Sequence, residues 1–277
     1  MTRSLLKRFA RYIALFALVV VALAFMLRQP SNYREWYAEL ARIPGVTIVN
    51  EHTVAIPYLR DWYLDASGAT IPNYVSRTYD TRTLERVWFF MQPFPDWDAL
   101  GHSFFSFDFA GEEPVIVSIE ARKEVGEEEF SPYLGAVRRY ELMYVWTTER
   151  DEIGRFVIGR KKPFYMYPLE VSKESAANLF MEAARRSAEV EARPQFYNTL
   201  AHNCTSILAD VANAITPGTI PWTFARVFTG NADDYLIARG YIATSSIARA
   251  DILDIVKTHN TRTTLSSAIR AHMLGLD

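Results

Sequence analysis

Cysteine is nearly absent from this sequence. The 277 residues include one, Cys204, which excludes an intramolecular disulfide, a cysteine-rich zinc module and a thioredoxin-type pair of thiols. The five histidines do not show the spacing of a helical metal pair such as H-E-x-x-H. We therefore expect neither a metal site nor a cofactor, and a thiol that is either packed in the core or used chemically.

An excess of basic charge is also absent, which argues against a nucleic-acid partner. Lys and Arg total 30 against 32 Asp and Glu. The distribution is uneven, because the first 28 residues hold five basic residues and no acid, which leaves a net charge of about −7 on the rest. With 49% hydrophobic and 14% aromatic residues, the chain is long enough to bury one sizeable core.

A charge-free run, YIALFALVVVALAFML, occupies residues 12–27. It is shorter than the usual transmembrane helix of about 20 residues and longer than a secretory h-region of about 7–15. Ala22-Leu23-Ala24 resembles a cleavage site, but the run stays apolar to Leu27, which favours an uncleaved anchor over residues 12–28. The basic segment 1–11 then lies in the cytoplasm and the body of the protein lies in the periplasm. A single transmembrane helix would anchor it in the inner membrane.

The hydrophobic pattern of the body predicts an α+β fold. Residues 32–42 read as an amphipathic helix leaving the membrane, with Trp36 and Tyr37 at the lipid interface. Period-two patterns then predict strands, and from Ser172 the period is helical. The expected strands are 46–50, 53–59, 86–91, 102–109, 114–121, 140–146 and 164–169; the expected helices are 172–192, 203–215 and shorter pieces to 276.

The thiol lies in YNTLAHNCTSILADVANAI, residues 197–215, at the predicted start of a helix. There the positive end of the helix dipole favours a thiolate. Asn203 is suited to cap the helix and to donate a hydrogen bond to an oxyanion. The alternative is a small buried hydrophobe, since Cys204 is in line with an apolar stripe. The stripe consists of Ile207, Leu208, Val211 and Ile215.

A thiol nucleophile needs a base, and the base needs a group that orients it. His102 opens a predicted strand and is the preferred candidate; His202 ranks lower because helical residues two apart do not face each other. On the next strand, period-two alternation places Ser118, Glu120 and Arg122 on one face. Glu120 or Ser118 is a candidate to hold the imidazole, and an ordinary solvated strand face is the alternative.

The order of these residues resembles that of circularly permuted papain-like thiol enzymes, which include the lecithin–retinol acyltransferase family. Over about residues 80–245 the sequence is more closely similar to the Lnb N-terminal periplasmic domain family, named after a lipoprotein N-acyltransferase. The stretches that carry this resemblance are GHSFFSF at 101–107, SIEARKEVGEE at 118–128, YELMYVWTTERD at 140–151 and FYNTLAHNCTS at 196–206.

The resemblance implies a circularly permuted papain-like fold, with an antiparallel sheet packed against helices over residues 80–245. A membrane-proximal helix and strands at 29–79 would precede this domain, and helices at 246–277 would follow it. It implies Cys204 as nucleophile, His102 as general base and Glu120 as the third member. Ser118, Arg122 and Tyr197 are candidate substrate contacts, with Arg122 suited to a phosphate.

Three functions follow from this sequence. The first is a membrane-anchored periplasmic cysteine acyltransferase, which moves an acyl chain from a membrane phospholipid through a thioester to an amine such as a lipoprotein N-terminus. The second is a thiol hydrolase, either a lipid esterase or a peptidoglycan amidase or peptidase. The third is a non-catalytic envelope binding module with a structural thiol. The oligomeric state is left open.

Overall fold

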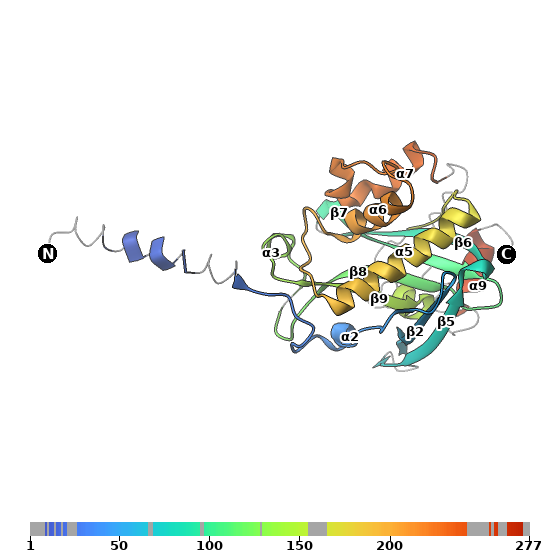
Figure 1. Cartoon of the computed structure of the whole chain (residues 1–277), viewed down its shortest axis with the longest axis horizontal. Helices are drawn as coiled ribbons and strands as arrows, with labels where there is room; N and C mark the ends of the chain where they lie inside the picture. The colour runs from blue at the N-terminus through green and yellow to red at the C-terminus, as the bar shows by residue number, and fades with distance from the viewer. Residues whose placement is uncertain are drawn as a thin grey trace.

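In the computed structural model the strands of the body form one mixed sheet (Figure 1). Its order is β1-β2-β9-β8-β7-β6-β10, and β5 pairs with β2 off this path. The strands are β1 (Thr47–Ile48), β2 (Thr53–Arg60), β5 (Tyr74–Asp80), β6 (Leu84–Phe94), β7 (Trp97–Phe109), β8 (Val115–Arg122), β9 (Glu141–Thr148) and β10 (Tyr165–Pro168). A separate small hairpin pairs β3 (Tyr63–Leu64) with β4 (Thr70–Ile71).

The structure describes residues 27–65, 69–94, 97–127, 129–154, 165–242 and 265–273, with short pieces at 9, 11–13, 15–17, 19–20, 255 and 258–259. Most of the predicted basic segment 1–11 lies outside the described residues, as do residues 14, 18 and 21–26 of the predicted anchor 12–28 and most of 246–277 except α9 (Leu265–Met273). Among the residues that are described, no helix combines the length and hydrophobicity needed to cross a membrane.

All seven predicted strands are present, with ends shifted by a few residues. Neither β5 nor the β3–β4 hairpin was predicted. The antiparallel sheet expected over residues 80–245 is present, because the pairs among β6, β7, β8, β9 and β10 are all antiparallel. The sheet as a whole is mixed, because β2, which precedes that range, pairs in parallel with β9 through Arg60 and Thr147. Parallel neighbours need a long connection. Here four further strands of the same sheet, β5, β6, β7 and β8, lie between β2 and β9 along the chain.

Two long helices cover one face of the sheet (Figure 1). They are α5 (Lys173–Ala192) and α6 (Cys204–Ile215), and both were predicted. The α5 helix begins where the Ser172 hydroxyl accepts a hydrogen bond from the Ser175 amide at 3.1 Å. The Phe180 ring packs there against Phe107, with centroids 5.1 Å apart, and Leu208 belongs to the same main core. The short elements nearby are α7 (Ala232–Ala238) and the 3₁₀ turns η3 (Phe224–Arg226) and η4 (Thr229–Asn231).

The opposite face of the sheet is covered by α4 (Glu149–Gly154) and α9, around a second core. The rings of Phe90 and Phe104 stack there with centroids 5.1 Å apart. Covering both faces explains the sequence FFSF on β7, since Phe104 faces this second core and Phe105 the main one. The remaining short elements are α2 (Ala38–Ala41), α3 (Pro132–Gly135) and the 3₁₀ turn η1 (Thr81–Thr83).

The segment before the sheet differs from the prediction. Of the helix expected over 32–42, only α2 forms. Trp36 is buried rather than placed at a lipid interface: its indole nitrogen donates to the Asn32 carbonyl at 3.0 Å, and the Arg122 guanidinium lies 4.2 Å from the ring centroid. The Tyr37 hydroxyl donates to the Glu127 carbonyl. The main chain of residues 35–37 forms hydrogen bonds with the chain that follows β8. This pairing holds the segment extended, although its sequence has the periodicity of a helix.

Arg270 fastens α9 to the sheet, which generates a stability prediction. Its guanidinium nitrogen Nη2 lies 2.6 Å from carboxylate oxygens of both Asp108 and Glu149, and it covers the Trp88 ring. Arg270→Ala leaves two carboxylates largely buried without this cation, so we expect the free energy of unfolding to fall by about 3–5 kcal/mol. Urea denaturation of the full chain in detergent measures this change.

Arg185 provides the matched control. It forms an ion pair with Glu182 on the exposed side of α5, and more than half of its side chain is in solvent. Arg185→Ala should change the free energy of unfolding by less than about 1 kcal/mol. Equal stability losses for the two variants would show that the Arg270 pairs do not hold α9 in place.

Candidate active site

The site forms where β7 and β8 separate. The last paired residues of these strands are Phe104 and Ser118. Continuing the register would set His102 opposite Glu120, and alternation places His102, Ser118 and Glu120 on the same face of the sheet. His102 therefore lies within β7, where it pairs with Gln92 of β6, and does not begin the strand as the sequence suggested.

Cys204 is the first residue of α6, as predicted, and it is buried with 5% of its surface exposed. Asn203 caps the helix, since its side-chain oxygen accepts a hydrogen bond from the Ser206 amide at 2.7 Å. The thiol sulfur lies 3.8 Å from the carbonyl oxygen of Gly101, the residue before His102. The helix start thus brings the thiol to the strand that carries the histidine.

The Asn203 side chain does more than cap the helix. Its amide nitrogen donates to the carbonyls of Thr199 and Arg226, both at 2.8 Å. Because these two bonds use both amide hydrogens, Asn203 fixes the loop before the thiol against the segment after α6. The predicted capping role is confirmed, whereas the predicted oxyanion donor is directed elsewhere in this structure.

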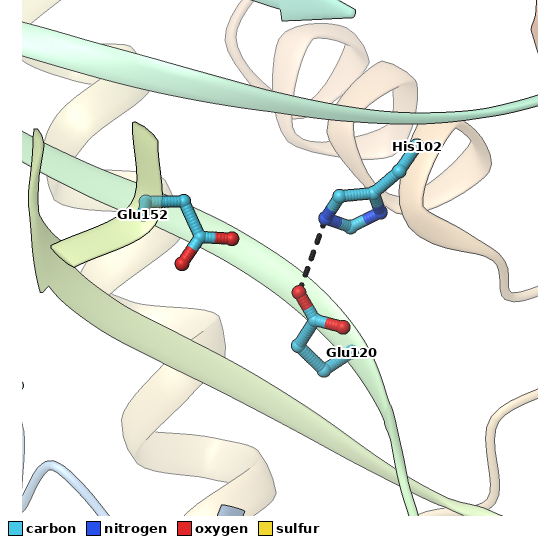
Figure 2. A group of neighbouring side chains, drawn as sticks. All are labelled: His102, Glu120 and Glu152. Atoms are coloured by element: carbon cyan, nitrogen blue, oxygen red, sulfur yellow. Dashed lines mark ion pairs between the residues drawn. The ribbon is translucent and has the colours of Figure 1, made fainter. Parts of the chain in front are cut away.

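Two side chains of β8 hold the imidazole. The His102 Nε2 atom lies 2.7 Å from the Ser118 hydroxyl oxygen. It also lies 3.1 Å from Glu120 Oε1 (Figure 2). The Ser118 hydroxyl donates to Glu120 at 2.7 Å, so it accepts from Nε2–H. This fixes the orientation of the ring, and Nδ1 is the ring nitrogen that neither contact uses.

The electrostatics of the pair favour a thiolate and an imidazolium. Burial is the largest influence on both groups; it lowers the pKa of His102 and raises that of Cys204. The Glu120 charge and the hydrogen bonds with Cys204 and Glu120 outweigh burial and raise the His102 pKa well above its ordinary value. The hydrogen bond and charge of His102 lower the Cys204 pKa below that of an ordinary thiol.

A second carboxylate, which the sequence analysis missed, lies beside the histidine. Glu152 of α4 projects toward His102 and Glu120, and the ligand atoms of the three side chains lie within 4.8 Å of one another (Figure 2). Such a set could hold a metal ion. Its geometry is also accounted for by ion pairs, because Arg60 binds Glu152 at 2.6 Å and Glu120 binds His102. The expectation of no metal stays a prediction.

The other predicted contacts divide between the site and the scaffold. Tyr197 lines the site, and its hydroxyl is hydrogen-bonded to the main chain of Cys204; burial raises its pKa well above the usual value, so it stays protonated. Arg122 is buried, and its guanidinium donates to the carbonyls of Leu40 and Ala41. It therefore fastens the N-terminal segment to β8 and is not a solvated arginine. His202 is exposed, consistent with its lower rank.

A cavity of about 120 Å³ opens onto the thiol and the imidazole. Thr229 of η4 closes one side, because its hydroxyl bonds both the carbonyl and the amide of Gly101 at 2.6 and 2.8 Å. Gly101 permits this approach, since an added Cβ would lie 3.5 Å from Gly230 and 3.1 Å from the Gln92 carbonyl. No pattern in the nearby sequence predicts that Thr229 belongs to the site. Glu152 could have been proposed, because it is one of several acidic residues directly after the apolar strand β9.

The electrostatics predict that Cys204 reacts faster at acidic pH than an ordinary thiol does. Its lowered pKa leaves a larger fraction of thiolate at pH 6, where an ordinary thiol with a pKa of about 8.5 is almost wholly protonated. We expect His102→Ala to slow alkylation by iodoacetamide at pH 6 by about tenfold or more, because both the hydrogen bond and the positive charge are lost. Mass spectrometry of the intact chain measures the rate.

His202→Ala is the matched control, since it removes an exposed histidine two residues from the same thiol; it should alkylate like the wild type. Glu120→Gln removes a charge that raises the His102 pKa, so the imidazolium should lose its proton at a lower pH in an NMR titration. Slow alkylation of the wild type at pH 6, unchanged by His102→Ala, would contradict the ion pair and favour a structural thiol.

Comparison with known proteins identifies the family of the chain. The family model for the Lnb N-terminal periplasmic domain matches residues 70–230, more than half of the chain, and this range includes Cys204, His102 and Glu120. No curated protein and no solved structure shows significant similarity to the chain. The matching description indicates a periplasmic, envelope-related protein. The chain belongs to the Lnb N-terminal periplasmic domain family.

Proposed function

We propose that the protein is a cysteine acyltransferase that moves an acyl chain from a membrane phospholipid to an amine, such as the N-terminus of a lipoprotein. The observation that carries this proposal is the buried Cys204 at a helix start, hydrogen-bonded to a His102 that Glu120 and Ser118 orient. Nucleophile, base and orienting group are the parts that covalent acyl transfer needs. Their order along the chain is that of a circularly permuted papain-like enzyme, which we propose as the fold.

The first half of the reaction forms a thioester. The Cys204 thiolate attacks the ester carbonyl carbon of the donor lipid, a C–S bond forms, and the carbonyl oxygen becomes an oxyanion. The carbonyl then re-forms as the C–O ester bond breaks, and the lysophospholipid alkoxide takes the proton of the His102 imidazolium. The Tyr197 hydroxyl, which accepts a hydrogen bond from the Cys204 main-chain N–H, is the donor we assign to the oxyanion.

The second half transfers the acyl group. The acceptor amine attacks the thioester carbonyl, His102 accepts a proton from the attacking nitrogen, and the C–S bond breaks to restore the thiolate and imidazolium. The product is an amide. Glu120 stabilises the charged imidazole in each half, through the 3.1 Å contact with Nε2.

An apolar cavity of about 230 Å³ supports a lipid as the donor. It lies between the sheet and helices α5 and α6, next to the residue that follows the nucleophile, and Thr205, Leu179, Leu208 and Phe105 are among its lining residues. We assign the acyl chain to this cavity. Burial of each methylene contributes about 0.8 kcal/mol, so a cavity of this kind selects long acyl chains over short ones.

The low exposure of the thiol favours transfer over hydrolysis. Cys204 and His102 are both more than nine-tenths buried, so water can reach the thioester only through the cavity onto which they open. The charge-free run at residues 12–27 would keep this site near its lipid substrates as the single inner-membrane anchor.

The test of acyl transfer uses the full chain with phospholipid vesicles and a diacylated lipopeptide, and Cys204→Ala as the paired variant. We expect the peptide to gain the mass of one acyl chain only with intact Cys204, and a thioester adduct on Cys204 when the amine is omitted. Mass spectrometry detects both products. Free fatty acid with no acylated peptide would replace the proposal by a lipid esterase, and no Cys204-dependent product would remove phospholipid as donor.

A second prediction tests the assignment of the acyl cavity. Ala212 lines the cavity, and Ala212→Phe would add a phenyl ring to the space assigned to the acyl chain. We expect turnover of long-chain donors to fall by about tenfold relative to short-chain donors. Ala214→Phe, on the exposed side of the same helix, is the control and should leave the preference unchanged. Equal chain-length profiles for the two variants would place the acyl chain elsewhere.

A further inference from the structure

Exposed apolar side chains gather around the mouth of the catalytic cavity. They belong to three segments that hydrogen bonds hold together: the Thr199 hydroxyl donates to the Pro132 carbonyl at 2.8 Å, and the Asn203 amide donates to the Arg226 carbonyl. Each segment also has a residue that lines the cavity or lies beside one that does. The exposed side chains are Tyr133, Leu134, Leu200, Trp222, Phe224 and Phe228.

These residues form a docking rim whose most exposed members are aromatic. Phe224 is 76% exposed, Tyr133 71% and Trp222 62%. Soluble proteins rarely expose neighbouring large apolar groups without a partner for them. Trp and Tyr are the side chains that favour the interface between lipid and water, and Phe and Leu insert more deeply. Exposed Arg138, close to Tyr133 and Leu134, adds a positive charge suited to lipid phosphates.

The end of the apolar run lies at this same end of the domain. Arg28 directly follows residues 12–27, and its guanidinium lies 2.5 Å from Glu124 and 5.8 Å from the ring centre of Phe196. The neighbours of those two residues, Lys123 and Tyr197, line the catalytic cavity. In Figure 1 the segment that begins at Arg28 joins the domain on the side of α3.

We infer that the docking rim rests on the surface of the phospholipid bilayer, with the mouth of the catalytic cavity facing the lipid. The anchor would not by itself orient the domain, because a chain can turn about a single attachment point; the rim supplies further points of contact. Trp222 and Phe224 flank Thr223, which lines the apolar cavity. Under the proposed function, a lipid chain can therefore pass from bilayer to cavity without crossing water.

The test places a fluorescent reporter on the rim of the full chain. In a Cys204→Ser background, a single new cysteine from Phe224→Cys is labelled with the environment-sensitive dye NBD, and the protein is reconstituted in phosphatidylethanolamine–phosphatidylglycerol vesicles. Val49→Cys is the matched control, an exposed apolar position next to β1 and outside the three segments. We expect a blue shift and quenching by brominated acyl chains for position 224 and neither for position 49.

The inference would be overturned if NBD at positions 224 and 49 gave the same emission spectrum and the same quenching. A blue shift at position 224 that brominated lipids do not quench would also overturn it, because it would indicate contact with protein, including a second copy of this chain. The measurement needs no catalysis, so it stands apart from the test of acyl transfer.

A second arm combines Trp222→Ser, Phe224→Ser and Phe228→Ser in the otherwise intact chain. It should lower turnover of vesicle lipid several-fold and leave Cys204 alkylation unchanged. If the triple variant turned over vesicle lipid as fast as the wild type, with an unchanged rate of Cys204 alkylation, the docking rim would not be what brings the cavity to the bilayer.

Discussion

The hydrogen-bonded pair of Cys204 and His102 is the interaction that the surrounding structure is arranged to maintain. Burying two groups that carry opposite charge costs free energy unless the remaining polar atoms are satisfied. Here Glu120 and Ser118 contact one nitrogen of the His102 ring. The sulfur belongs to the first residue of α6, at the positive end of the helix dipole. Each contact depends on the separation of β7 and β8 beyond Phe104 and Ser118, which gives the start of α6 access to the histidine.

The parts of the site that follow from local chemistry were predictable from the sequence. Asn203 before an apolar helical stripe indicates a capped helix start, and alternation along β8 places Ser118 and Glu120 on one face. These rules need only neighbours in the chain, so Cys204, His102 and Glu120 could be proposed together. All three lie within the range that the family model matches.

The parts that failed depend on contacts between distant segments. Trp36 has the periodicity of an exposed interfacial helix, yet pairing with the chain after β8 and the Arg122 guanidinium bury it. From the sequence alone, the Asn203 side-chain amide could donate a hydrogen bond to an oxyanion. The structure shows that it donates to the carbonyl of Arg226, a residue 23 positions away in the chain. Glu152 joins the site because α4 covers the face of the sheet that carries His102, and periodicity cannot show which helix covers which face.

The choice between transfer and hydrolysis depends on how the site meets its surroundings. A thioester reacts with whichever nucleophile reaches it, and an amine that enters from the bilayer competes with water only where water is scarce. Under the proposed function, a cavity mouth held against lipid by aromatic side chains would limit water and give both substrates one route of entry. The buried thiol and the exposed docking rim would then serve one requirement: the carbonyl carbon of the thioester is sheltered from water while lipid keeps access to it.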